Sequence, residues 1–173
     1  DLVRNGFDLA IRIARLPDSS LIARRLVTIR HVCVASPVLL ERLGTPQEPA
    51  ELSRFPGVIY SNVDEARYWK FTCDVLPSVA SRLDFANGDA IREAAIAGVG
   101  VAVLPTFIVH DAVRRGELSI VLAKHMRPPI AMHAVHPSMR NQTARARAFI
   151  NFLVDTGVRS NILFSKKEKS LVS

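Results

Sequence analysis

The sequence predicts an α/β protein, and three observations support this prediction. First, residues 87–105 (NGDAIREAAIAGVGVAVLP) have the pattern of a helix, a glycine turn and a buried strand in direct succession. Second, segments with helical spacing alternate with short runs rich in Val and Ile, the order typical of a largely parallel sheet covered by helices. Third, the chain has 173 residues, of which 49% are apolar and 23% charged, enough to bury the core of a globular domain.

The helix in this stretch is predicted from its cap and its apolar stripe. Asn87 or Asp89 can cap the helix start, because a short polar side chain accepts a hydrogen bond from an otherwise unpaired backbone amide. Ile91, Ala94 and Ala95 follow at the spacing that places them on one helix face. This face is expected to pack against the sheet.

Two glycines and a proline delimit the strand that follows. Gly98 stands where a helix end requires the left-handed conformation, and Gly100 permits close packing of helix and strand. Residues 99–104 form an apolar run rich in Val, which is typical of a strand buried on both faces. Pro105 cannot continue the strand ladder and is expected to end it.

The other elements follow from similar signals. Ser36 and Pro37 mark a helix start, with the hydroxyl as cap and proline in the first turn. Thr106 as cap and Gly116 as stop delimit another helix. Helices are expected up to Gly6, over 37–43, 49–55, 106–115 and 142–156, the last with Phe149, Phe152 and Leu153 on one face. Strands are expected over 7–13, 24–35, 57–61, 118–122 and 130–136, with a rigid linker at 127–129 and a β-hairpin of 68–74 and 78–85 across Pro77.

Three segments of the chain have a specific order and spacing. The first comprises residues 1–13 (DLVRNGFDLAIRI) and 16–26 (LPDSSLIARRL). The second comprises 34–40 (VASPVLL), 44–46 (GTP) and 49–52 (PAEL), and the third is 87–105, continued by 116–118 (GEL) and 133–137 (HAVHP). Each motif alone is weak. Together, over residues 1 to about 155, they resemble the effector-binding domain of LysR-type transcriptional regulators.

The resemblance implies two Rossmann-like subdomains joined by two crossover strands, as in type 2 periplasmic solute-binding proteins. Subdomain I would comprise residues 1–35 and 130–160, and subdomain II residues 36–129, with crossovers near 35–36 and 129–130. Residues 161–173 lack periodicity and are expected to form a disordered tail.

The resemblance also implies an N-terminally truncated, incomplete subdomain I. The family's effector domain begins with a strand and a helix that would precede Asp1. That strand would lie beside residues 7–13, so an open edge with an apolar face of Phe7, Leu9 and Ile11 is expected. The family's helix-turn-helix domain lies further upstream. DNA contact is therefore expected only through that absent domain, and a dimer or tetramer only of the full-length protein.

Charge and hydropathy narrow the classes of partner. The formal net charge is +7, yet the basic residues are scattered, and only 166–169 (KKEK) forms a run. Solvated surface charge is therefore favoured over a nucleic-acid platform. No apolar run reaches the roughly 18 residues that a membrane span requires, and the start has no signal-peptide pattern. A cytoplasmic location, no membrane partner, and reduced Cys33 and Cys73 are expected.

Residues able to support catalysis do not cluster along the sequence. Ser36 lacks a Gly-x-Ser-x-Gly context, and His133 and His136 would face opposite sides of a strand and make a poor metal pair. Residues 98–100 (GVG) lack the third glycine of a dinucleotide fingerprint, and Trp69 is expected in the core. No enzyme activity, no metal and no cofactor are therefore expected.

The remaining kind of function is the binding of a ligand at the ends of the strands. In an open α/β sheet, ligands bind beyond the carboxyl ends of the strands. Ser36, Asn87 and Thr106 are such ends and also helix caps, whose free amides favour a carboxylate or another small anion; ordinary capping is the alternative role. In the family, the effector cleft lies between the subdomains and uses these loops. The candidate effector-binding residues are Ile13, Ala14, Ser36, Tyr60, Ser61, Asn87, Gly88, Pro105 and Thr106.

The resemblance implies the effector-sensing domain of a bacterial LysR-type regulator, in which a small molecule shifts the population of conformations and so controls transcription. The alternative is a periplasmic solute-binding protein that delivers substrate to a transporter. An upstream signal peptide would favour the alternative, and an upstream helix-turn-helix would exclude it. A small-molecule enzyme is a third hypothesis and lacks a cluster of acid–base groups.

Overall fold

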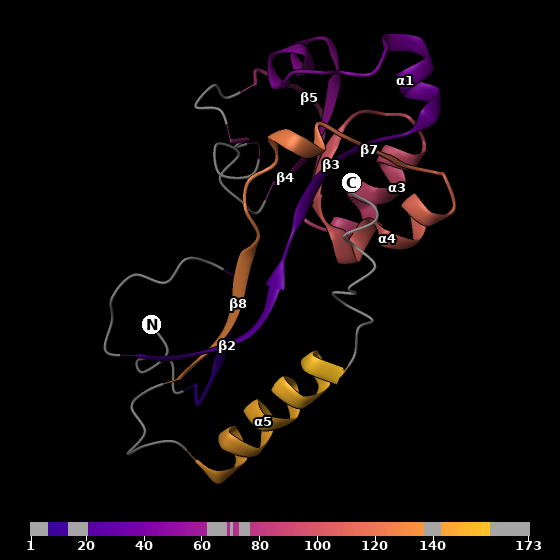
Figure 1. The fold of residues 1–173 in the computed structure, drawn as a ribbon. Coiled ribbons are helices and arrows are strands. Elements are labelled where there is room, and N and C mark those ends of the chain that lie inside the picture. Colours follow the sequence, from indigo (N-terminus) through magenta and orange to yellow (C-terminus); the bar gives the residue numbers. More distant parts are fainter. Residues whose placement is uncertain are drawn as a thin grey trace. The chain divides into compact units, whose positions relative to one another are not determined.

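A computed structural model describes residues 7–13, 21–61, 69, 71–72, 77–136 and 143–159. These residues form two compact units (Figure 1). Unit 1 contains the described residues up to Ile29 and those from Pro129 onward, and unit 2 contains Arg30–Pro128. The first passage between the units therefore follows Ile29, upstream of the crossover expected at residues 35–36. No described helix is both long and apolar enough to cross a membrane.

Unit 1 is an antiparallel sheet with one long helix. Strand β8 (Ile130–His136) lies between β1 (Ala10–Ile13) and β2 (Ile22–Ile29). Helix α5 (Ala144–Arg159) contacts β2. The guanidinium of Arg24 in β2 donates a hydrogen bond to the side-chain oxygen of Asn151 in α5 over 2.7 Å.

The buried face of helix α5 is not the one that carries Phe149 and Phe152. Ala146 and Ile150 are buried, whereas Phe149 and Phe152 are 49% and 61% exposed. Ala146 and Ile150 are one helical turn apart and share a face, and the small Ala146 lets the helix backbone approach its neighbours closely. The helix expected over residues 142–156 is therefore present, and tertiary structure decides which of its faces is buried.

Strand β1 is an edge of this sheet. It pairs with β8, and no second strand in the described part of the chain pairs with it. Phe7 and Ile11 are 62% and 44% exposed. Two of the three apolar residues expected on an open edge are therefore exposed, Leu9 is half-buried, and the strand itself begins only at Ala10.

The single strand expected over residues 24–35 is two strands. Strand β2 ends at Ile29, and β3 (His31–Ala35) begins after Arg30. Strand β2 pairs with β8 in unit 1, whereas β3 pairs with β6 (Ala102–Pro105) and β7 (Ser119–Val121) in unit 2. Both halves form strands and only Arg30 separates them, so the sequence gives no local sign that they belong to different sheets.

The sheet of unit 2 is mixed, which corrects the expected largely parallel arrangement. Strand β3 is antiparallel to both β6 and β7, while β4 (Pro56–Tyr60) is parallel to β5 (Ala80–Phe85). A parallel bridge between Gly57 and Val101 joins the two parts. It is held by backbone hydrogen bonds of 2.9 Å from Val58 N to Val101 O and 2.8 Å from Val101 N to Pro56 O. The resulting strand order is β5-β4-β6-β3-β7.

The β-hairpin expected across Pro77 is wrong in the described part of the chain. Strand β5 pairs with β4 in parallel, and Phe71 forms an isolated antiparallel bridge with Met126. Each half of the expected hairpin therefore pairs with a different, more distant segment. Trp69 and Phe71 are both buried in the core, as expected for Trp69.

Helices cover both faces of this sheet. One core cluster contains Cys33, Val101 and Val103, with residues of α1 (Pro37–Leu43) and of the 3₁₀ helix η1 (Pro49–Arg54). The other contains the alternate strand residues Val32, Ala102 and Leu104, with residues of α3 (Gly88–Ile96) and α4 (Thr106–Arg114). Successive strand residues thus reach opposite layers. Helices α3 and α4 contact each other in the second layer (Figure 1).

Burial also decides the chemistry of Cys33. The side chain is fully buried in β3, opposite Val103 and Val121. This burial raises the pKa of the thiol to about 12, because the thiolate would lose its hydration. Cys33 therefore packs as a small apolar residue. Cys73 lies outside the described residues.

Of the two glycines between α3 and β6, Gly98 has the expected role, whereas Gly100 allows close contact with a strand rather than with a helix. Gly98 has φ 75°, the left-handed region in which a side chain is strained. A Cβ at Gly100 would overlap the carbonyl group of Pro56. Gly100 therefore lets this segment approach β4 closely enough for the bridge between Gly57 and Val101.

Replacing Gly100 with alanine should destabilise unit 2. The new methyl group meets backbone that cannot rotate away, so the free energy of unfolding should fall by about 1–3 kcal/mol. Urea denaturation measures the change. Ala94→Ser, at a half-buried position of α3, serves as a control and should cost less. An unchanged denaturation midpoint for Gly100→Ala would contradict the close approach of the two segments.

Candidate ligand-binding site

Several candidate residues meet at one edge of the unit 2 sheet. Tyr60 ends β4 opposite Phe85, the last residue of β5, and the backbone N–H of Ser61 donates to the Phe85 carbonyl over 2.9 Å. The parallel bridge between Gly57 and Val101 gives β6 the same direction as β4. The carboxyl ends of β4, β5 and β6 therefore lie at the same edge, where ligands of open α/β sheets bind.

Gly88 connects this edge to helix α4. It is buried, and a Cβ built on it would lie 2.5 Å from the Ile108 Cδ1 atom and 3.7 Å from the Tyr60 ring. Tyr60 of β4, Gly88 of α3 and Ile108 of α4 are therefore neighbours. The absence of a side chain at Gly88 leaves room for the first turn of α4.

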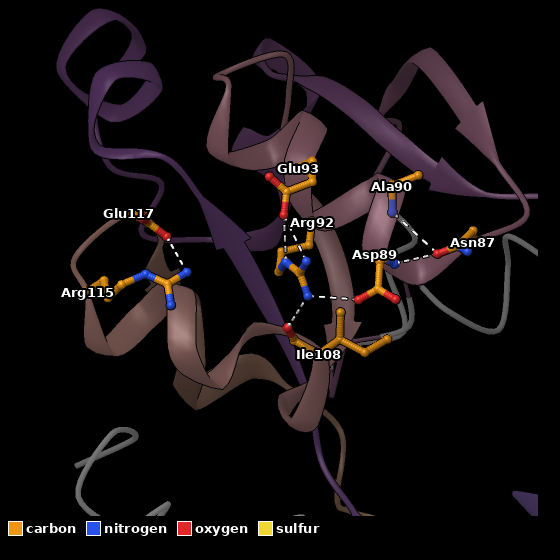
Figure 2. A network of polar contacts seen from close by, with 8 residues as sticks. All are labelled: Asn87, Asp89, Ala90, Arg92, Glu93, Ile108, Arg115 and Glu117. Atoms are coloured by element: carbon orange, nitrogen blue, oxygen red, sulfur yellow. Dashed lines mark hydrogen bonds and ion pairs between the residues drawn. The ribbon is translucent and has the colours of Figure 1, made fainter.

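Asn87 caps helix α3, as expected (Figure 2). Its side-chain oxygen accepts the backbone N–H groups of Asp89 and Ala90, over 2.7 Å and 3.4 Å. Asp89 adds a carboxylate in the first turn. The first amides and the positive dipole end of α3 thus already face oxygen atoms of the chain itself, which disfavours a further anion there.

Arg92 ties α3 to α4. One guanidinium nitrogen binds the Asp89 carboxylate over 2.8 Å and donates to the Ile108 carbonyl over 3.3 Å, and the other contacts Glu93 over 2.8 Å. The hydrogen bond to Glu93 raises the pKa of Arg92, so the guanidinium stays charged. Arg115 and Glu117 form a separate pair beyond the end of α4 (Figure 2).

Helix α4 starts differently from the expected manner. Thr106 is its first residue rather than its cap, and no side chain caps this helix. The backbone N–H and the hydroxyl of Thr106 both donate to the Arg30 carbonyl, over 2.9 Å and 3.2 Å. The first turn of α4 contains no acidic residue. Of these two helix starts, α4 therefore presents the more electropositive one.

Ser36 lies at the opposite edge of the sheet. Strand β3 is antiparallel to β6, so His31 stands opposite Pro105, while Ser36 follows Ala35 at the other end. The Ser36 hydroxyl accepts the backbone N–H of Leu39 over 3.3 Å, and it lies 3.3 Å from a Cβ built on Gly98. Ser36 is therefore next to the end of α3, whereas Asn87 is at its start, a separation of about 13 Å along the helix axis.

Ser36, Asn87 and Thr106 therefore do not all lie together as expected. Only some of the nine candidate residues share one edge. Tyr60, Ser61, Asn87, Gly88 and the Pro105–Thr106 junction share one edge, and Ser36 is a buried cap elsewhere. Ile13 is the last residue of β1, in unit 1. Ala14 lies outside the described residues.

His31 is a residue of this edge that the sequence analysis did not select. It is the first residue of β3 and is paired in register with Pro105, next to Thr106. Burial lowers the pKa of His31 to about 4, so the imidazole is neutral at neutral pH. In the sequence it is an isolated histidine, and only the antiparallel register of β3 places it here. Across the described residues, no group of acidic, His or Cys side chains could hold a metal ion.

Comparison with known proteins identifies the class of this domain. The family model described as the LysR substrate binding domain matches residues 1–157. A helix-turn-helix transcriptional regulator of Haemophilus influenzae is 34% identical over 144 residues, which cover 82% of this chain and 50% of the regulator. The transcriptional activator AaeR of Escherichia coli is 30% identical over 172 residues, covering 96% of this chain and 55% of AaeR.

Solved structures agree with the sequence comparison. The regulatory domain of CrgA, a LysR-type regulator from Neisseria meningitidis, is 28% identical with a TM-score of 0.74; the match covers 88% of this chain and 76% of that domain. The whole CrgA structure gives a TM-score of 0.77 at 27% identity, covering 90% of this chain and 54% of CrgA. The predicted type 2 periplasmic-binding-protein-like fold is confirmed. The chain belongs to the LysR substrate-binding domain family, and it spans about half the length of the curated relatives.

The buried His31 predicts an acid-dependent loss of stability. Its pKa is about 4 in the folded chain and about 6.5 when exposed. As the pH falls from about 6.5 to 4, the unfolded chain binds a proton that folded His31 does not bind. Folding should lose up to about 3 kcal/mol through this group, and none above pH 6.5.

Urea denaturation of the wild type and of His31→Gln at pH 7 and pH 4.5 tests this prediction. Carboxylates contribute equally to the pH dependence of both proteins. The variant should therefore lose less stability than the wild type between pH 7 and pH 4.5, and the difference is the contribution of His31. An equal loss in both would show that His31 is protonated as readily in the folded chain as in the unfolded one.

Proposed function

We propose that this chain is the effector-sensing domain of a LysR-type transcription regulator, and that a small molecule binds at the edge formed by Tyr60, Ser61, Asn87, Gly88 and Thr106. The single observation behind the proposal is the convergence of three parallel strand ends and the first turn of α4 in a LysR substrate-binding domain. Ligands of such sheets bind at these ends. The related proteins are transcriptional regulators, which favours this function over solute delivery to a transporter.

The ligand class follows from the helix start of α4. It has no capping side chain and no acidic residue in its first turn, so its dipole favours a carboxylate or another small anion. The exposed Ser61 adds a hydroxyl at this edge, and Tyr60 adds a half-buried aromatic ring. A small carboxylate with an apolar body fits this combination. Binding without catalysis is proposed, because no acid–base pair lies among these residues.

The mechanism proposed is a population shift. A ligand that binds one conformation of the domain better than another biases the equilibrium by its differential affinity, typically 1–3 kcal/mol. In the whole protein, this bias would change DNA binding by a helix-turn-helix domain outside this sequence. The whole protein would act in the cytoplasm as a dimer or tetramer.

Ligand-induced stabilisation tests the site. A small carboxylate at a hundredfold excess over its Kd should raise the free energy of unfolding by about 2.7 kcal/mol, seen as a thermal shift in a carboxylate screen. Thr106→Val should reduce that shift directly, and Asn87→Ala should reduce it because loss of the cap loosens the start of α3 that borders this edge. Ser36→Ala is the matched control, because it removes a helix cap of similar cost, about 1 kcal/mol, at the opposite sheet edge.

The comparison separates loss of stability from loss of binding. Asn87→Ala and Ser36→Ala should both lower the melting temperature without ligand, but only Asn87→Ala should lose ligand response. If all three variants keep the full response, the ligand binds elsewhere and the proposed site is wrong.

A further inference from the structure

A row of basic side chains crosses the sheet of unit 1. In the register of the sheet, Arg12 of β1 is opposite His133 of β8, and His133 is opposite Arg25 of β2. Directly opposed residues of antiparallel strands lie on the same face. Arg12, His133 and Arg25 therefore stand side by side on one face of the sheet.

Mostly small side chains flank this row. The neighbouring positions on the same face are Ala10 and Ala23, the buried Val135, which pairs with both of them, and Ala131 with its partner Thr28. Ala23 is exposed, as are Arg12 and Arg25, and Ala10 and Ala131 are half-buried. Arg24, the neighbour of Arg25 in β2, points to the other face and binds Asn151 of α5. The basic row thus lies on the face away from the α5 contact, with both arginine side chains exposed.

Within the described ranges, no carboxylate balances the charge of the row by forming an ion pair with Arg12 or Arg25. The guanidinium of Arg25 donates to the Thr28 hydroxyl, which holds it against the exposed side of its own strand β2. The Nδ1 atom of His133 is buried without a hydrogen-bond partner. A buried unpaired polar atom calls for an explanation.

We propose that this face of unit 1 binds a small oxyanion of the phosphate type, held by Arg12 and Arg25 with His133 between them. Two strand spacings separate the arginine Cα atoms by about 10 Å, a span that two long side chains can close above the imidazole. Guanidinium groups match phosphate oxygens with paired, charge-assisted hydrogen bonds. Because Nδ1 is sealed from solvent, Nε2 is the imidazole nitrogen available to a ligand.

The charge balance favours phosphate over a simple carboxylate. Two guanidinium groups match the double charge of a phosphate, and three donor groups require more acceptor oxygens than one carboxylate carries. The site lies wholly within unit 1. It is independent of the effector site proposed at the strand ends of unit 2, so either can fail without the other.

Titration with inorganic phosphate at constant ionic strength tests the proposal. Backbone amide shifts of residues 10–13 and 130–136 should follow a saturable one-site curve by NMR. Arg12→Gln and Arg25→Gln should each weaken binding about tenfold or more, the usual size for a lost charge-assisted hydrogen bond. Both side chains are exposed, so the variants should fold, which circular dichroism verifies. Sulfate and glycerol phosphate titrations distinguish a free oxyanion from a phosphate ester.

Arg24→Gln is the matched control. It removes the same charge from the same strand but on the opposite face, and it should leave phosphate binding unchanged. Arg25→Lys keeps the charge without the planar fork and should bind with intermediate strength. Shifts that do not saturate, or an equal weakening in Arg24→Gln, would reduce the row to diffuse surface charge and overturn the proposal.

Discussion

The burial of β3 between two antiparallel neighbours is the constraint on which unit 2 depends. Val32, Cys33, Val34 and Ala35 are all buried, and alternate residues of this strand enter the two core layers. A strand that is apolar on both faces must be central, because neither face can be left in water. Because β3 is antiparallel to β6, its first residue, His31, lies at the same edge as Thr106. Ser36, which follows its last residue, lies at the opposite edge.

The close approach of β4 and β6 completes that edge. The chain at Gly100 runs against the Pro56 carbonyl, where no side chain would fit, and the backbone hydrogen bonds of Val101 join the two strands. The parallel ends of β4, β5 and β6 therefore open on one side. The same contact brings Gly88 under Ile108, so that α3 and α4 start beside each other.

Local charge explains why neighbouring helix starts differ in character. Helix α3 neutralises its own start with Asn87, Asp89 and the Arg92 network, whereas α4 begins after a proline with neither a capping side chain nor an acidic residue. In unit 1, strand pairing places three basic residues side by side. They form the cross-strand row of Arg12, His133 and Arg25. Scattered basic residues in the sequence thus become, through strand pairing, one oriented group.

The sequence by itself determined the elements that local chemistry specifies. The helix beginning at Ser36 and Pro37, the Asn87 cap, the left-handed Gly98 and the stop at Gly116 depend on short-range hydrogen bonds and backbone conformation. The bounds of the strand Ile130–His136 also followed from the sequence, although its hydrogen bonds are to the distant strands β1 and β2. Tertiary structure alone decided the break at Arg30, the antiparallel sense of β3, the partner of β5 and the buried face of α5. These depend on which distant segments pair, and an apolar run carries no record of its partner. For the same reason, the sequence named most residues of the candidate edge but could not separate Ser36 from it or add His31 to it.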